Sequence, residues 1–184
     1  MIVNIWKIIK EGYISLYYNI NGDKRPIAPI VLWYIILPLA IGIYSYINQT
    51  IFTENTINLL ISVFSIFTAL IFGIIFIAPD KFAKRIEVYK KSIADESISN
   101  YLIRYENFTK GFVKQIALLI VYSIVIIILL VITQIHDVSL FKIIIHSIVI
   151  TFFSEFILLT FTLLSNIYIL LIDDIENSSK NKRE

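Results

Sequence analysis

The chain has 184 residues, of which 58% are hydrophobic and only 16% are charged. Soluble domains are about 45–50% apolar and about 25% charged, so this composition excludes an ordinary soluble globular fold. The formal net charge is +2, which gives no overall preference for nucleic acid. The sequence contains no cysteine, which excludes disulfides, Cys-ligated zinc, iron–sulfur clusters and thiol nucleophiles.

Residues 1–22 have the pattern of an amphipathic helix rather than of a cleavable signal peptide. Apolar side chains recur there at helical spacing, and no small-residue cleavage site follows them. The residues on this apolar face are Ile2, Ile5, Trp6, Ile9, Tyr13, Leu16, Tyr17 and Ile20. We expect this helix to lie in the plane of the inner membrane interface.

Four long apolar runs follow, and each is long enough to cross a hydrocarbon core of about 30 Å. They extend over Ile27–Ile47, Ile57–Ala78, Phe112–Ile135 and Leu140–Ile172. Because lipid offers no partners for backbone polar groups, these runs predict helices, and the fold class is an all-α membrane protein with a four-transmembrane-helix bundle. Pro38 lies within the first run and predicts a kink, because it leaves the carbonyl of Tyr34 without its helical donor.

The whole chain, residues 1–184, reads as a single membrane domain. Residues 79–111 between the second and third spans predict a cytoplasmic helical hairpin that extends both spans, and residues 173–184 form a polar tail. Fifteen of the sixteen Lys and Arg residues fall in the N-terminal segment, this hairpin region or the tail, with Lys142 as the exception. The positive-inside rule therefore places both termini in the cytoplasm, as expected for a multi-pass protein of a bacterial inner membrane.

Glu155 is the most informative single residue, because a carboxylate within a span costs several kcal/mol unless it is protonated, paired or hydrated. The polar residues around it fall on one face of the fourth helix, at 100° per residue. These candidate pore-lining residues are Ser147, Thr151, Ser154, Glu155, Thr162, Ser165 and Asn166. This face either lines an ion path at the centre of an oligomer, or packs against other helices with Glu155 bonded to Tyr122 or Ser123.

A second candidate site is the basic face that follows Pro79. Its members are Lys81, Lys84, Arg85 and Lys91. They predict either a ligand-binding site for an anionic molecule such as a nucleotide or oligonucleotide, or ordinary anchoring at anionic lipid headgroups. We find no hydrolase, metalloprotease or P-loop motif, so we expect no enzyme activity, no cofactor and no metal site.

The layout resembles the small four-pass membrane proteins of bacterial anti-phage defence systems, namely the Kiwa membrane subunit and nucleotide-gated membrane effectors. The features that carry the resemblance are the amphipathic start, the entry Arg25-Pro26-Ile27-Ala28-Pro29, the run from Leu59 to Ala78-Pro79-Asp80, and the basic hairpin. The resemblance implies an effector that disrupts or opens the membrane on receiving a cytoplasmic signal. It carries no motif that assigns roles to individual residues.

These observations support two leading hypotheses and a third, weaker one. The first is an oligomeric ion channel effector, with a tetramer as the guessed stoichiometry, gated by a cytoplasmic nucleotide-type signal. The second is a non-conducting membrane sensor, scaffold or immunity-type protein that recruits a soluble partner. The third is a small transporter, which four spans with a single intramembrane acid support least.

Overall fold

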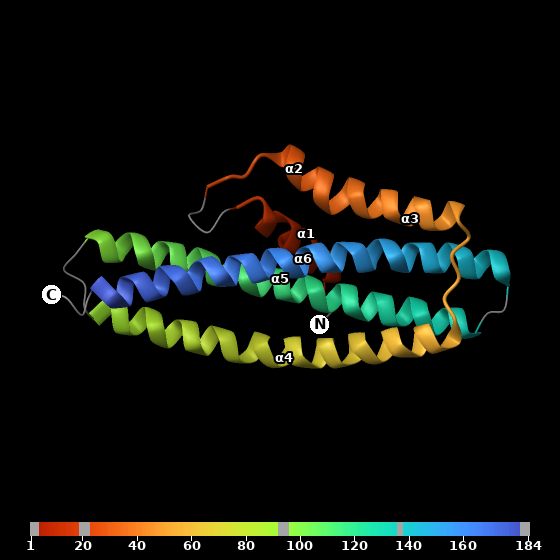
Figure 1. Cartoon of the computed structure of the whole chain (residues 1–184). Coiled ribbons are helices and arrows are strands. Elements are labelled where there is room, and N and C mark those ends of the chain that lie inside the picture. The colour runs from red at the N-terminus through yellow and green to blue at the C-terminus, as the bar shows by residue number, and fades with distance from the viewer. Residues whose placement is uncertain (1–3, 19–22, 92–95, 136–137, 181–184) are drawn as a thin grey trace.

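The computed structural model describes residues 4–18, 23–91, 96–135 and 138–180; the side chains of 75–86, 88–102, 104, 170–171 and 173–180 are outside that description. The described residues are helical apart from short connections (Figure 1). In chain order the elements are α1 (Ile5–Leu16), α2 (Ile27–Val31), the π-helical turn η1 (Leu32–Ile36), α3 (Leu37–Ile47), α4 (Glu54–Lys91), α5 (Glu96–Ile135) and α6 (Ser139–Lys180).

The fold is an all-helical bundle with four membrane-spanning helices among the described residues, as the sequence predicts. The candidate spans are Ile27–Ile47, Glu54–Ile74, Tyr105–Ile135 and Ser139–Ile169. α5 packs against α4, α6 and the short α1, whereas α3 packs against α6. Figure 1 shows α4, α5 and α6 running alongside one another, with the α2–η1–α3 segment beside α6.

The three long helices are about twice as long as a membrane is thick. α4 has 38 residues, α5 has 40 and α6 has 42, which correspond to about 57, 60 and 63 Å at a rise of 1.5 Å per residue. A hydrocarbon core of about 30 Å accommodates only half of each helix. The C-terminal parts of α4 and α6 and the N-terminal part of α5 project beyond α2 on one side (Figure 1).

The first span contains a π-helical turn immediately before Pro38, at the position where the sequence predicts a kink. Within this turn, the N–H of Leu37 donates to the carbonyl of Leu32, five residues earlier. π-turns are a common way for a helix to adjust around a residue that cannot donate. The π-helical turn over residues 32–36 therefore accommodates the hydrogen bond that Pro38 cannot donate, and the helix continues as α3 to Ile47.

The core of the bundle is centred on α5. Its fully buried side chains include Leu118, Leu119, Ile126 and Leu130. On α4, the ring of Phe64 meets Phe153 and Phe156 of α6 edge to face, with centroids 5.8 and 5.1 Å apart. Such aromatic pairs add specific geometry to apolar packing, which gives the helices a defined register where lipid supplies no hydrophobic driving force.

His146, which the sequence left without a role, holds the connection between α3 and α4. Its Nδ1 accepts a hydrogen bond from the backbone N–H of Phe52 at 3.1 Å, and the two rings lie 4.7 Å apart. The side chain of Gln134 donates to Asn58 at 2.8 Å and links α5 to α4. These polar contacts stabilise the end of the bundle opposite to the α4–α5 connection.

Gly42 allows α3 to approach α6 closely. A Cβ atom added to Gly42 would clash with the hydroxyl of Thr151 and would lie 3.1 Å from the carbonyl oxygen of Ser147. Small residues at such contacts let two helix backbones pack tightly in lipid. The position of α3 on the polar face of α6 therefore depends on the absence of a side chain at residue 42.

We predict that Gly42→Ala destabilises the protein by about 1–3 kcal/mol, because the added methyl group overpacks the α3–α6 contact. Gly73→Ala is the matched control, since a Cβ there meets nothing within 4 Å; it should gain up to about 1 kcal/mol of helix propensity. Thermal unfolding in detergent measures both. Equal stability of the two variants would contradict the close packing of α3 on α6.

Candidate functional site

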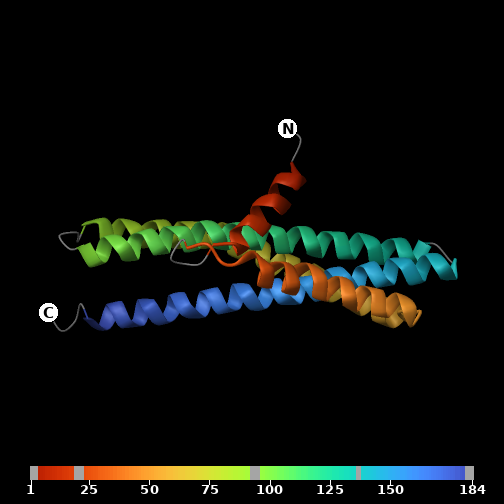
Figure 2. The ribbon, with the colours of Figure 1, turned by 90° about the horizontal axis from the view of Figure 1, so that it is seen from above.

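The short helix α1 stands at a steep angle to the long helices, with its C-terminal end against the bundle and its N-terminal end pointing away from it (Figure 2). Asn4 caps its start, with Oδ1 accepting from the backbone N–H of Lys7 at 3.2 Å. Gly12 faces α5 so closely that an added Cβ would lie 2.8 Å from the Cβ of Leu118. The structure thus places the predicted amphipathic helix crosswise, with its glycine and Leu16 buried.

One ion pair joins α1 to α5. The Nζ of Lys114 lies 2.7 Å from an Oε atom of Glu11, and the two side chains are 41% and 39% exposed. The hydrogen bond from Lys114, with the charge of the same residue, holds the pKa of Glu11 below its ordinary value. Such a half-exposed pair contributes little to stability, and it can be exchanged for another partner at low cost.

A buried hydrogen-bond network joins α1 to both α5 and α6. The hydroxyl of Tyr13 donates to Oε1 of Glu155, and its oxygen lies 2.5 Å from the hydroxyl of Tyr122. Because the one proton of Tyr13 is used toward Glu155, Tyr122 is the donor in the second bond. The sequence predicts that Glu155 is bonded to Tyr122 or Ser123, but the hydroxyl bonded to its carboxyl group is that of Tyr13, and Tyr122 is bonded to Tyr13.

Glu155 lies well inside the membrane-spanning region and is only 6% exposed. Its neighbour Tyr122 is eight residues beyond Lys114 on α5, or about 12 Å along the helix axis. An acidic group at this depth is costly unless it is protonated, paired or hydrogen-bonded. Tyr13 supplies that hydrogen bond, so the docking of α1 and the burial of Glu155 are coupled.

Other members of the predicted pore-lining face contact helices of the same chain. The hydroxyl of Thr162 is hydrogen-bonded to Tyr34 of η1. Ser147 and Thr151 lie against Gly42 of α3. Hydrogen bonds to the helix backbone also satisfy the hydroxyls; they run from Ser147 to Ile143, from Thr151 to Ser147, from Ser154 to Ile150 and from Thr162 to Leu158, at 2.8–2.9 Å.

The remaining two members lie farther along α6. Ser165 is exposed, and with Asn166 it lines an open groove that also includes Arg25 and Trp33. The side chain of Asn166 donates to Oε1 of Gln115 at 3.5 Å. Along α6, the residues of the polar face that make contacts therefore meet α3, α1, η1 and α5 in turn. Its role as the lining of a pore stays a prediction.

The basic face predicted to bind an anionic ligand belongs to the projecting part of α4. The helix itself extends to Lys91. The side chains of its four members, Lys81, Lys84, Arg85 and Lys91, lie outside the described residues, so their role as ligand-binding residues also stays a prediction.

Sequence reasoning missed the residues that cover the polar face, namely Tyr13, Tyr34 and Gly42. Each is found in an apolar run, and periodicity assigns them only to a helix face. The prediction that Ser123 bonds to Glu155 was wrong, because the hydroxyl of Ser123 donates to the backbone carbonyl of Leu119 at 2.9 Å. Tyrosines among aliphatic residues on an otherwise apolar helix face are the one signal that pointed to a buried polar partner.

No protein-family model, curated protein or solved structure matches this chain. The class of protein therefore follows from the fold alone: the chain is a multi-pass helical membrane protein. Its site consists of a short crosswise helix that hydrogen-bonds to an intramembrane acid.

We predict that Tyr13→Phe releases α1, because it leaves the carboxyl group of Glu155 and the hydroxyl of Tyr122 without a partner, at a cost of about 1–3 kcal/mol. Since the sequence contains no cysteine, spin labels at introduced Lys7→Cys and Ile128→Cys measure the distance between α1 and α5. Tyr13→Phe should lengthen and broaden that distance. The control Tyr44→Phe, at an exposed position of α3, should leave it unchanged; an unchanged distance in Tyr13→Phe would show that the network does not hold α1.

Proposed function

We propose that this chain is a non-conducting membrane sensor or scaffold that signals through the release of α1. The observation that carries the proposal is the hydrogen bond from Tyr13 of α1 to Glu155 of α6. It makes the position of an interfacial helix depend on a group buried inside the bundle. The α4–α5 hairpin, which projects beyond the spans, is the part that would reach a soluble partner.

A closed resting state is supported by the contacts of the polar face. Glu155 is bonded to Tyr13, Thr162 is bonded to Tyr34, and Thr151 lies under Gly42. A pore lined by these side chains would require α1 and α3 to leave them first. The described contacts are those expected when polar residues hold helices together in lipid.

An ion channel effector is the second candidate function, and one observation favours it. The side chain that donates to Glu155 comes from α1, which is short and lies crosswise, rather than from a long spanning helix. Release of α1 would expose the carboxyl group of Glu155 within the membrane-spanning region. In a homo-oligomer, which we propose to be a tetramer, the Glu155 carboxyl groups would form a ring that attracts cations.

The orientation in the membrane rests on charge. Lys110 and Lys114 lie on the same side of the bundle as the projecting hairpin, and α1 docks close to this level. An amphipathic helix at the headgroup boundary and a basic hairpin both favour the cytoplasmic side of a bacterial inner membrane. The layout resemblance to anti-phage membrane proteins is the support for placing this sensor in a defence system.

We predict that a reporter fused after Gln49 is external, and that reporters fused after Ile93 and Arg183 are cytoplasmic. The reason is the strong excess of Lys and Arg on one side of the four spans. Paired phosphatase and fluorescent-protein fusions measure this. A cytoplasmic reporter after Gln49 would overturn the orientation.

Ion flux into liposomes separates the two candidate functions. If the chain is a non-conducting sensor, the purified protein and Tyr13→Phe should both leave flux at the background of empty vesicles. If it is a channel held shut by α1, Tyr13→Phe should raise cation flux about tenfold or more, and adding Glu155→Gln should remove the cation preference. If the unchanged protein conducts cations and Glu155→Gln reduces that flux, the closed resting state is refuted.

A further inference from the structure

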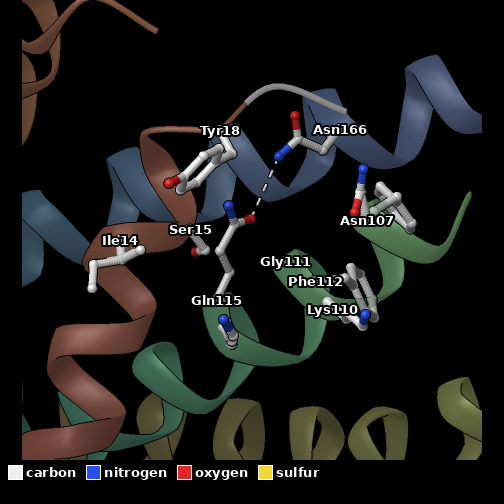
Figure 3. Close-up of a pocket in the computed structure, with 11 residues that line it drawn as sticks. Ile14, Ser15, Tyr18, Asn107, Lys110, Gly111, Phe112, Gln115 and Asn166 are labelled. Carbon is white, nitrogen blue, oxygen red and sulfur yellow. Dashed lines mark hydrogen bonds between the residues drawn. The ribbon is translucent and has the colours of Figure 1, made fainter. Parts of the chain in front are cut away.

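A cavity lies between α1, α5 and α6, next to the ion pair that holds α1 (Figure 3). Its volume is about 300 Å³. Small-molecule sites have volumes of about 300–1,000 Å³, so the cavity is large enough for a headgroup or a mononucleotide, but it is too small to enclose an oligonucleotide.

The wall of this cavity is rich in amides. Gln115 is only 5% exposed and reaches the cavity from α5, where its side chain meets Asn166 of α6. Asn107 lines the same space about two turns earlier on α5, one turn before Gly111 (Figure 3). Amide groups both donate and accept, so they suit ligands that carry phosphate, hydroxyl or base edges.

Two lysines on α5 complete the cavity. Lys110 pairs with Glu106 and Lys114 pairs with Glu11, each at 2.7 Å. All four side chains are between 39% and 65% exposed, so both pairs are accessible from solvent. A phosphate group carries up to two charges and several acceptor oxygens, and it therefore competes well against a single carboxylate for an exposed lysine.

We propose that this cavity binds the phosphate group of a small ligand, either an inner-leaflet phospholipid headgroup or a soluble nucleotide, and that the phosphate takes Lys114 from Glu11. Loss of that pair removes one of the contacts that dock α1, and so shifts the equilibrium toward the undocked state, in which Tyr13 is withdrawn from Glu155. The ligand thus binds the undocked state more tightly than the docked state, which is the condition for a ligand to shift the equilibrium. This coupling deepens the proposed function and rests on it. Binding of a phosphate group in the cavity is independent of the proposed function.

Gly111 provides a steric test of the site. A Cβ added to Gly111 meets nothing within 4 Å, and this residue lines the cavity. Gly111→Leu therefore places a bulky side chain at the wall of the cavity, and its Cβ atom meets no neighbouring atom. Gly73→Leu is the matched control, because residue 73 has the same open surroundings on α4, away from the cavity.

The experiment uses the full-length chain in phosphatidylcholine nanodiscs. Radiolabelled AMP and inorganic phosphate are the soluble probes, and replacing part of the lipid by phosphatidylglycerol is the lipid probe. Equilibrium dialysis measures binding of the soluble probes, and native mass spectrometry counts retained phosphatidylglycerol. We expect Gly111→Leu and Lys114→Gln to weaken binding about tenfold or more, and Gly73→Leu to leave it within about twofold. Glu11→Gln should strengthen binding, because it removes the competitor for Lys114.

The outcomes separate the two sources and the two proposals. Binding of AMP supports a soluble nucleotide as the ligand. If phosphatidylglycerol is retained by the unchanged protein and not by Gly111→Leu, the ligand is a lipid headgroup. Failure of every probe to bind, or equal binding to Gly111→Leu, overturns the site. If a probe binds but the distance between labels at Lys7→Cys and Ile128→Cys does not change, the coupling to α1 is refuted while the site stands. If the site fails but Tyr13→Phe still releases α1, the proposed function survives without this ligand.

Discussion

The structure depends on one constraint: an acidic side chain within a membrane-spanning helix must have a hydrogen-bond donor. Glu155 is buried among apolar helices, and the donor comes from Tyr13 of a helix that does not span the membrane. Removing that donor would leave a polar group in hydrocarbon, where no water replaces it. The position of α1 against α5 and α6 follows from satisfying this one group.

Two glycines make the arrangement geometrically feasible. Gly12 brings α1 against Leu118, and Gly42 brings α3 against Thr151. Without the first approach, the hydroxyl of Tyr13 would not reach Glu155, since a tyrosine has little freedom to adjust its reach. Without the second, α3 would not cover the hydroxyls of α6. Close backbone approach and hydrogen bonding are therefore parts of a single solution to helix packing in lipid.

Much of the fold was predictable from the sequence, because lipid imposes strong rules on composition. Apolar runs of about 20 residues predicted the four spans, and helical spacing predicted α1. Glu155 was predictable as the important residue because an acid is conspicuous in an apolar run. Its partner was not, since α1 can lie on the membrane surface in many orientations, and only tertiary packing at Gly12 selects the one that presents Tyr13. Likewise, periodicity placed Thr151 and Thr162 on one face of α6, but it does not say which helix covers that face.

The energetics make α1 a suitable moving part. A helix of 12 residues is marginal alone in water, but an amphipathic one remains folded at a membrane interface. Undocking therefore loses only the contacts with α5 and α6, and the helix itself need not melt. Those contacts are a half-exposed ion pair, a glycine contact, the buried side chain of Leu16 and one buried network, whose combined free energy is of the order of several kcal/mol. A ligand shifts an equilibrium of that size with a difference in affinity of about 100- to 10,000-fold between the two states. This difference corresponds to roughly 3–5.5 kcal/mol. Displacing Glu11 from Lys114 supplies up to about 1 kcal/mol of it, so a phosphate ligand biases the position of α1, whereas moving one of the long spanning helices would require far more.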